Sequence, residues 1–239
     1  VDAPATELHV SQDVINTTAG PTYTVNSEET NPRGITFNND GTKMFIVGTT
    51  GDDVNEYTVS TGFDLSSTVS FVDSYAVSQC PNPTAVKFNT DGTKMFVTGV
   101  GNNNVHQYAL TTGFDVSTAS FTQTLVTTVD NDNFGLDFNN DGTKMYITGN
   151  QYDKIYQFNL SSPFDISTAT FNQDLYTGSI DIEPFGIEWS TDGYRLFIVG
   201  TRGNGVDEFK LTSAFDISTA THVGYYHIGC LLYTSDAAD

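Results

Sequence analysis

The sequence predicts an all-β protein, a β-propeller with four recognisable four-stranded blades of about fifty residues each. Three observations predict this fold. Two sequence markers recur in one register, each copy contains four strand patterns separated by turn signals, and the composition favours strands. The 239 residues include 21 Gly, 12 Tyr and 17 Phe, and no long stretch has helical period, so helix should be scarce.

The first marker is an Asp-Gly turn inside the motif FNNDGTKMFIVG, which begins at Phe37. Its four copies place the shared aspartate at Asp40, Asp91, Asp141 and Asp192, which gives steps of 51, 50 and 51. The second marker is Phe-Asp-x-Ser, which recurs with the same steps at Phe63, Phe114, Phe164 and Phe215. Two markers in one register establish a tandem repeat.

Each copy contains four short strand patterns. In the first copy these cover 34–37, 43–48, 54–59 and 69–77, and the Asp-Gly pair suits a hairpin turn that needs positive φ. Neighbouring blades cover both faces of a propeller blade, which explains the continuous apolar run at 44–47. We expect the repeated phenylalanines to fill the space between blades, and Asp64 and its equivalents to bond their own loop backbone.

The repeat divides the chain into blades at 33–82, 83–133, 134–183 and 184–229. Residues 1–32 form an N-terminal segment that ends in the last strand of a partial blade, because 23–32 parallels 75–83. Residues 230–239 leave the repeat and resemble a translated sequencing adapter, so we interpret them, with Cys230, as a non-native tail. We therefore expect a fragment of a six- or seven-bladed propeller.

The strand-turn-strand motif resembles the YVTN and TolB-type, WD-like propeller repeats, and tandem repeats common in marine bacteria and their phages. Residues 189–193, Trp-Ser-Thr-Asp-Gly, are similar to the Trp-Ser-Pro-Asp-Gly of TolB-type repeats. The resemblance covers about residues 20–229 and implies the propeller fold. These families include periplasmic interaction proteins, surface proteins and some lactonases, so the resemblance leaves the function open.

The charge balance limits the partners that we expect. Nine basic against 29 acidic side chains give a net charge of -20, which repels phosphate backbones and anionic lipid headgroups. We expect no nucleic-acid partner, and no membrane insertion because no apolar run approaches about 18 residues. A protein or a carbohydrate is the expected ligand. An extracellular, cell-surface or virion location is expected, with the periplasm as the alternative, and the oligomeric state is open.

No catalytic motif is present, so no catalytic residue is predicted. The sequence lacks a Gly-x-Ser-x-Gly elbow, a His-Glu-x-x-His pair and a phosphate-binding Gly-rich loop, and its four histidines share no repeat position. No cofactor is expected. Calcium is an alternative because loops 52–53, 130–133 and 181–183 are rich in Asp, Asn and Glu, although none matches an EF-hand.

The connections between strands divide into two groups. The Asp-Gly turn and the Phe-Asp loop barely change between copies and should share one face of the disc, which we call the repetitive face. The other connections vary, and we call their side the variable face, because ligand residues gather on variable loops of a rigid frame. Its candidate ligand-binding residues are Asp52, Asp53, Asn102, Asn103, Asn104, Asp130, Asp132, Tyr152, Asp153, Asp181, Glu183, Arg202 and Asn204.

The repetitive face has a basic residue at one position in every copy. These residues are Lys43, Lys94, Lys144 and Arg195. Two interpretations stay open: a positive ring that meets an acidic partner, or charges that offset the neighbouring aspartates.

Three functions follow from these observations. The first is a non-catalytic binding module that recognises a glycan or a protein through the acidic variable face. The alternative is a calcium-assisted, lactonase-like hydrolase with carboxylates and amides at the mouth of a central channel. The second alternative is an architectural repeat spacer without a ligand.

Overall fold

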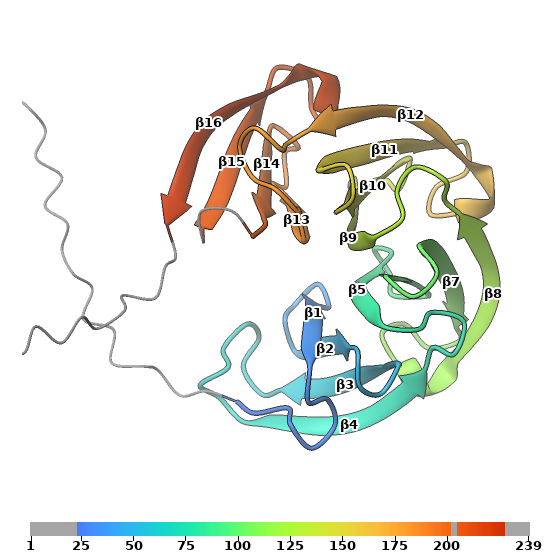
Figure 1. Ribbon diagram of the computed structural model, residues 1–239. Helices are drawn as coiled ribbons and strands as arrows, with labels where there is room; N and C mark the ends of the chain where they lie inside the picture. Colours follow the sequence, from blue (N-terminus) through green and yellow to red (C-terminus); the bar gives the residue numbers. More distant parts are fainter. Residues whose placement is uncertain (1–22, 202–204, 228–239) are drawn as a thin grey trace, which may run out of the picture.

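The computed structural model describes residues 23–201 and 205–227, without the side chain of His227. These residues form four four-stranded antiparallel sheets arranged as a four-bladed β-propeller (Figure 1). Blade 1 consists of β1 (Pro32–Phe37), β2 (Lys43–Gly48), β3 (Asp53–Val59) and β4 (Val69–Ala76). Blade 2 consists of β5 (Pro83–Phe88), β6 (Lys94–Gly99), β7 (Asn104–Leu110) and β8 (Ala119–Val126).

The other two blades repeat this order. Blade 3 consists of β9 (Asn133–Phe138), β10 (Lys144–Gly149), β11 (Lys154–Leu160) and β12 (Ala169–Tyr176). Blade 4 consists of β13 (Gly186–Trp189), β14 (Arg195–Val199), β15 (Gly205–Leu211) and β16 (Ala220–His227). The predicted strands of the first copy are thus confirmed to within two residues at each end. Neighbouring strands in the sequence pair in the sheet, so each blade is a simple meander with its first strand innermost.

The Asp-Gly turn closes the first hairpin of each blade as predicted. In blade 3 the Oδ1 atom of Asp141 accepts a hydrogen bond from the backbone N–H of Thr143 at 3.0 Å, and Gly142 has a φ of 70°. The other three turn glycines have φ values between 71° and 73°. Aspartate therefore fixes the turn, and glycine supplies the left-handed conformation that it requires.

The core lies between blades. The ring of Phe96 on β6 packs against Phe138 on β9 with centroids 4.6 Å apart, and Tyr146 packs on Trp189 in the same way at 4.7 Å. The second strand of blade 2 is covered by both neighbouring blades, because Met95 and Val97 pack on blade 1 and Phe96 packs on blade 3. This double coverage explains the continuous apolar run and confirms that prediction.

The Phe-Asp loop contains a short element that the sequence analysis did not predict. In blades 2, 3 and 4 it continues into a 3-10 helix, and these helices are η1 (Val116–Thr118), η2 (Ile166–Thr168) and η3 (Ile217–Thr219). The preceding aspartate caps each helix, as in Asp165, whose Oδ1 accepts from the N–H of Ser167 at 3.1 Å. The predicted bond from this aspartate to its own loop is confirmed in all four blades.

A pair of side chains joins each of the first three blades to the next. Lys43 on β2 donates to the backbone carbonyl of Phe114 at 2.6 Å, and Glu56 on β3 accepts from the N–H of Val116 at 2.9 Å. We call such a pair the latch pair. In blade 2 the latch pair is Lys94 and Gln107, which bind the carbonyl of Phe164 and the N–H of Ile166. In blade 3 it is Lys144 and Gln157, which bind the same two groups of Phe215 and Ile217. The structure therefore gives these lysines a third role, the joining of blades.

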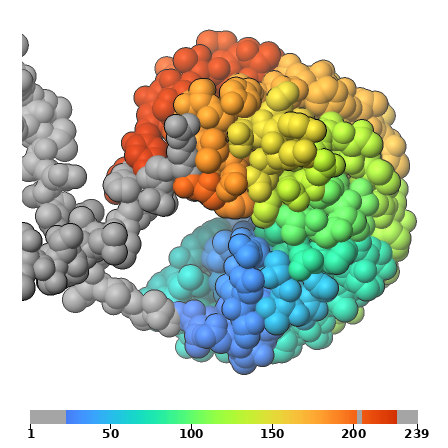
Figure 2. Space-filling model, in the orientation of Figure 1, coloured from blue at the N-terminus to red at the C-terminus, as the bar shows by residue number. Residues whose placement is uncertain are grey.

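Two predictions about blade 1 differ from the structure. Residues 23–30 form a turn rather than a strand, since no partner strand lies beside them in the described chain. Phe63 is 62% exposed instead of filling a space between blades, because an opening separates blade 1 from blade 4 (Figures 1 and 2). Phe114, Phe164 and Phe215 do pack between blades, as predicted.

Several sequence predictions fall outside the described residues. These concern His9, the whole of residues 230–239 and the cysteine at 230. Cys80 is buried and unpaired with any described cysteine, and burial raises the pKa of its thiol to about 12. In the part of the chain that the structure describes, no helix is long and apolar enough to span a membrane.

Candidate functional site

One position of the innermost strands changes its chemistry from blade to blade. It is the third residue of the Gly-Ile-x-Phe motif, and its neighbours in the motif stay apolar or small. The residues at this position are Thr36 on β1, Lys87 on β5, Asp137 on β9 and Glu188 on β13. Since all four strands line the axis of the propeller, the repeat brings these side chains to its central channel.

Three of the four side chains form an ion-paired group, which we call the channel cluster. The Nζ atom of Lys87 lies 3.2 Å from Oδ1 of Asp137 and 2.8 Å from Oε2 of Glu188. The second bond crosses from blade 2 to blade 4 and joins residues 101 positions apart. The side chains of Lys87 and Asp137 are 19% and 11% exposed, whereas that of Glu188 is 67% exposed. The cluster thus has two buried members and one that faces solvent.

The channel cluster has shifted proton affinities. Burial raises the pKa of Asp137 above its usual range, and Lys87 opposes this effect only in part. Burial by itself would lower the pKa of Lys87, but the two carboxylates outweigh it and raise that pKa. Lys87 is therefore a permanent cation at neutral pH, and Asp137 takes up a proton more readily than an ordinary aspartate does.

A cavity of about 370 Å³ lies along the channel next to this cluster. Lys87 and Glu188 form part of its wall, together with Arg33 and the rings of Phe134 and Phe185. The two rings stack edge to face with centroids 4.5 Å apart. A second hollow, on the side of the repetitive face, is lined by Thr36, Lys87 and Asp137. The channel cluster therefore lies between the two cavities.

The cluster offers an ammonium donor and carboxylate acceptors within one small apolar space. Hydroxyl groups of a ligand can donate to the carboxylates and accept from the ammonium, while the rings pack against apolar faces. A divalent cation does not fit the cluster, because the ammonium group of Lys87 already lies between the two carboxylates. Among the described residues, no group of three or more His, Cys, Asp or Glu side chains is close enough to hold a metal ion.

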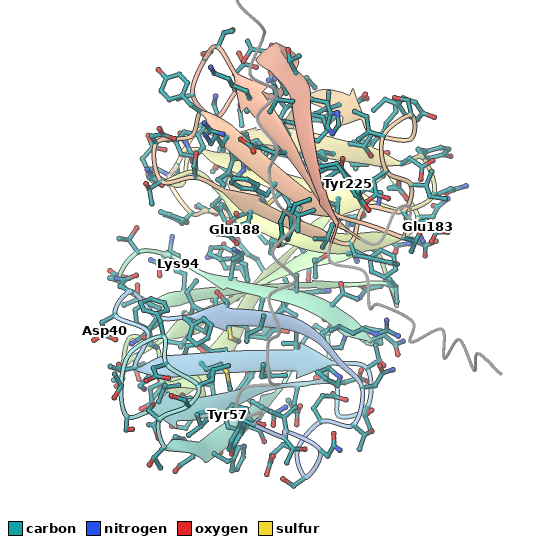
Figure 3. All side chains as sticks on the ribbon, turned by 90° about the vertical axis from the view of Figure 1, so that its left-hand side faces the viewer. Asp40, Tyr57, Lys94, Glu183, Glu188 and Tyr225 are labelled. Carbon is teal, nitrogen blue, oxygen red and sulfur yellow. The ribbon has the colours of Figure 1, made fainter. Side chains whose placement is uncertain are left out.

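The variable face lies on the side of the disc opposite to the repetitive face. Figure 3 shows Asp40 and Lys94 at one edge of the blades and Glu183 at the other, with Glu188 between the upper and lower blades. On the repetitive face, the N–H of Phe164 bonds to the carbonyl of Gly142 at 2.9 Å, which holds the two repeated loops together. The predicted division of loops between the two faces therefore agrees with the structure.

Three predicted ligand residues occupy one repeated turn position with positive φ. Asp52, Asn103 and Asp153 have φ values of 50°, 57° and 52°. The Oδ1 atoms of Asp52 and Asp153 accept from the N–H groups of Asn82 and Glu183, in the link to the next blade, at 2.7 and 2.8 Å. Asx side chains tolerate this conformation, and those of Asp52 and Asp153 also satisfy a backbone donor there, so the turn itself accounts for these residues.

Two other predicted ligand residues are buried. Asp130 accepts hydrogen bonds from the N–H groups of residues 131, 132, 151 and 152 and from the hydroxyl of Tyr156. Asp181 is fully buried at the equivalent place in the next link, and Glu29 occupies that place before blade 1. Cys80 is their counterpart before blade 2. Asp130 and Glu29 each accept backbone N–H groups on both sides of such a connection, and so hold it in place.

The remaining predicted residues are distributed along the variable face. Asn102 bonds to Gln79 and His106, Asp53 bonds to Asn55, and Tyr152 is half exposed. Asn104, Asp132 and Glu183 are partly buried, and Arg202 and Asn204 lie outside the described residues. The structure distributes the described members of this set over the loops of blades 1 to 3 and the links that precede blades 3 and 4, rather than bringing them into one pocket.

The sequence analysis missed the channel cluster, although a signal for it was present. Within a motif that is otherwise nearly constant, one position carries Thr, Lys, Asp and Glu in turn. Charged and polar side chains at an inward position of a repeat are typical of a ligand site or of a specific ion pair. This position lies within a strand, outside the variable loops from which the ligand residues were predicted.

No family model matches the chain, and no curated protein matches it in sequence. Solved structures do share its fold. A candidate 6-phosphogluconolactonase from Bacteroides fragilis is 16% identical with a TM-score of 0.56, and the match covers 80% of this chain and 53% of that one. A periplasmic gluconolactonase from Pseudomonas aeruginosa is 14% identical with a TM-score of 0.53, and the match covers 83% of this chain and 54% of that one.

The hydrazine synthase of Kuenenia stuttgartiensis is also similar in structure, with 17% identity, a TM-score of 0.53, and coverage of 89% of this chain and 52% of that one. At these identities the likeness shows the propeller fold alone. The chain spans about half the length of these structures. The specific resemblance to YVTN and TolB-type repeats, the adapter origin of residues 230–239 and a six- or seven-bladed disc stay predictions.

Proposed function

We propose that this protein is a non-catalytic binding module that recognises a carbohydrate at the variable face, with one sugar unit entering the central channel. The observation that carries the proposal is the channel cluster beside a cavity of about 370 Å³, which is of the size that small ligands occupy. Lys87 and Glu188 supply a donor and an acceptor for sugar hydroxyls, and Phe134 and Phe185 supply the apolar wall.

The charge of the site favours a neutral ligand. The variable face is acidic, and the channel cluster contains one cation and two carboxylates. The wall of the cavity has Arg33 and Lys87 beside Glu188, so the repulsion of an anionic sugar comes from the variable face, and a neutral glycan avoids that repulsion and the desolvation of a further charge. The extracellular or surface location and the protein ligand that the sequence predicts remain predictions.

A glycan array followed by calorimetry tests the proposal. The wild-type protein should retain neutral glycans, and Lys87→Met and Glu188→Gln should each weaken binding at least about tenfold, or about 1.4 kcal/mol. Lys210→Met is the matched control, since Lys210 is exposed near the end of β15 that leads to the repetitive face. Tyr152→Ala measures the contribution of the variable loops. Equal binding by wild type and both channel variants would contradict the channel assignment.

A lactonase-like hydrolase is the second candidate, because Asp137 combines a raised pKa with a place at a cavity. A carboxylate of this kind can accept a proton from water as the water adds to a lactone carbonyl, and return it to the leaving ring oxygen. The test is hydrolysis of a lactone panel by wild type and Asp137→Asn. Hydrolysis by wild type that Asp137→Asn abolishes would replace the binding proposal, whereas no hydrolysis by either protein would leave the binding module.

A further inference from the structure

Blade 4 presents a latch pair that holds no following blade in the described chain. Arg195 on β14 and Glu208 on β15 occupy the positions of Lys43 and Glu56 in blade 1. In blades 1 to 3 this pair binds the carbonyl and the N–H groups of the next blade's Phe-Asp loop. In blade 4 the two side chains pair with each other, as Lys43 and Glu56 also do, but they bind no following loop in the described chain, and 53% and 29% of their side-chain surface is exposed.

Blade 1 presents the loop that a latch pair holds. Its Phe-Asp loop contains Phe63 and Leu65, which are 62% and 38% exposed. The equivalents of Leu65 in the other blades, Val116, Ile166 and Ile217, are fully buried against the preceding blade. On the innermost strand, Ile35 is 53% exposed, whereas its equivalents Val86, Leu136 and Ile187 are at most 7% exposed. Blade 1 therefore exposes the apolar residues that the other blades bury.

The aromatic residues of the two surfaces are complementary as well. Phe45 on β2 packs against Phe88 of the next blade with ring centroids 4.5 Å apart, and Phe88 packs on Phe114 at 5.3 Å. Blade 1 contains the same preassembled pair in Phe37 and Phe63, which are 5.5 Å apart. Blade 4 contains the counterpart of Phe45 in Phe197, which is partly buried.

The two surfaces border the opening of the disc. Figure 2 shows this opening between the described residues of blade 1 and of blade 4, and Figure 3 shows Tyr57 and Tyr225 on its two sides. Within one molecule the two surfaces do not pack on each other. They are nevertheless a matched pair, because the contact between any two consecutive blades is made from the same residue positions.

We propose that the exposed face of blade 4 in one copy of this chain docks on the exposed face of blade 1 in a second copy. Arg195 would bind the carbonyl of the partner's Phe63, Glu208 would accept from the N–H of the partner's Leu65, and Phe197 would cover the pair formed by Phe37 and Phe63. A head-to-tail contact of this kind joins two copies by one interface, or closes a dimer when it is made twice.

The occupant is a second copy because this chain itself carries both halves of the contact. Any other protein, or a further blade of a longer disc, would need the same Phe-Asp loop at the same register to satisfy the latch pair, and a monomeric 239-residue chain would favour such a further blade. The contact would bury Phe63, Leu65 and Ile35, and these exposed apolar side chains would otherwise be costly to solubility. The proposal does not depend on the ligand at the channel.

Sedimentation of the 239-residue chain over a wide range of concentration tests the proposal. The wild-type chain should self-associate reversibly. Leu65→Asp and Phe197→Asp should each raise the dissociation constant at least about tenfold, because a buried carboxylate opposes the contact. Val126→Asp is the matched control, since Val126 is exposed on the last strand of blade 2, away from both faces. It should leave the dissociation constant within about twofold.

Mixing the two variants distinguishes this contact from any other. Leu65→Asp keeps an intact blade 4 face, and Phe197→Asp keeps an intact blade 1 face. Each variant should therefore be monomeric by itself, and an equimolar mixture should form a heterodimer through one intact contact. A wild-type monomer at every concentration would overturn the proposal. So would a wild-type dimer that neither variant weakens, or a mixture that does not reassociate.

Milder substitutions guard against misfolding of these variants. Arg195 is exposed and Glu208 is partly exposed, so Arg195→Ala and Glu208→Ala should fold, and each should weaken association several-fold. Arg195→Lys and Glu208→Gln restore the residues found at these positions in other blades, and should associate as the wild type does. Equal loss in the alanine and the conservative variants would contradict the latch role.

Discussion

Gly142 lies directly against the ring of Phe164, so a Cβ atom at position 142 would overlap that ring. The two residues belong to the two repeated loops of blade 3, and the N–H of Phe164 also bonds to the carbonyl of Gly142. The same arrangement recurs in all four blades. The two markers that revealed the repeat are thus in direct contact, which explains why they keep the same register.

Gly142→Ala should destabilise the protein by about 2–4 kcal/mol, because Gly142 has a φ of 70° and a methyl group would displace Phe164. Chemical denaturation measures the change. Gly224→Ala is the matched control, since a Cβ atom there would meet no neighbouring atom within 4 Å. The control should change the free energy of unfolding by less than about 0.5 kcal/mol. A similar loss in both variants would refute the packing argument.

Lys94→Met should lower the free energy of unfolding by about 1–2 kcal/mol, because it leaves the carbonyl of Phe164 without the charged donor that lies 2.8 Å away. Lys154→Met removes an exposed ion pair with Asp174 and should cost at most about 0.5 kcal/mol. Thermal unfolding of the two variants side by side makes the comparison. Equal costs would mean that the latch pair adds no more than a surface charge does.

Asp130→Ala should destabilise the protein by about 3 kcal/mol, because four backbone N–H groups and the hydroxyl of Tyr156 lose their acceptor. Asp132→Ala, two residues away and partly exposed, should cost less than about 0.5 kcal/mol. Ligand binding by the folded fraction of Asp130→Ala provides a second readout. If Asp130→Ala were as stable as the wild type but bound ligand more weakly, Asp130 would be a ligand residue rather than a structural one.

His106 should make stability depend on pH below neutrality. Burial lowers its pKa to about 4 in the folded state, whereas an unfolded histidine titrates near pH 6.5. The unfolded state therefore binds the proton more readily. The contribution of His106 is complete above about pH 6.5 and is lost as the pH falls toward 4, by on the order of 2–3 kcal/mol.

Denaturation of wild type and His106→Gln at several pH values measures this contribution. Glutamine keeps a polar side chain beside Thr124 and Asn102 but has no proton to gain. The difference between the two proteins should shrink between pH 6.5 and pH 4. A difference that is constant over this range would show that His106 is not the titrating group.

Most of the fold could be predicted from the sequence because the repeat supplies the same information four times. The Asp-Gly turn, the apolar run of the second strand and the Phe-Asp loop each have a local physical reason, and the structure confirms them. The 3-10 helices could not be predicted from the sequence, because each has only three residues and packs against the last strand of the preceding blade. The strand predicted within residues 23–32 is absent from residues 23–30 for a related reason. A strand needs a partner, and its own sequence does not specify that partner.

For the site, the sequence identified polar loop residues but could not tell structural carboxylates from exposed ones. Asp130 and Asp132 look alike in the sequence, yet the first is buried among N–H donors and the second is not. Burial depends on the path of the link between blades, which is a tertiary property.

The sequence by itself determined the period, the strand order within a blade and the turn chemistry, because these depend on interactions between neighbouring residues. Only the tertiary structure decided which residues meet across blades. It brought Lys87 to Glu188 over 101 positions, gave the repeated lysines their latch role, and left Phe63 and Leu65 exposed beside an opening. Such contacts depend on how the blades are arranged around the axis, and identical repeats acquire different surroundings there.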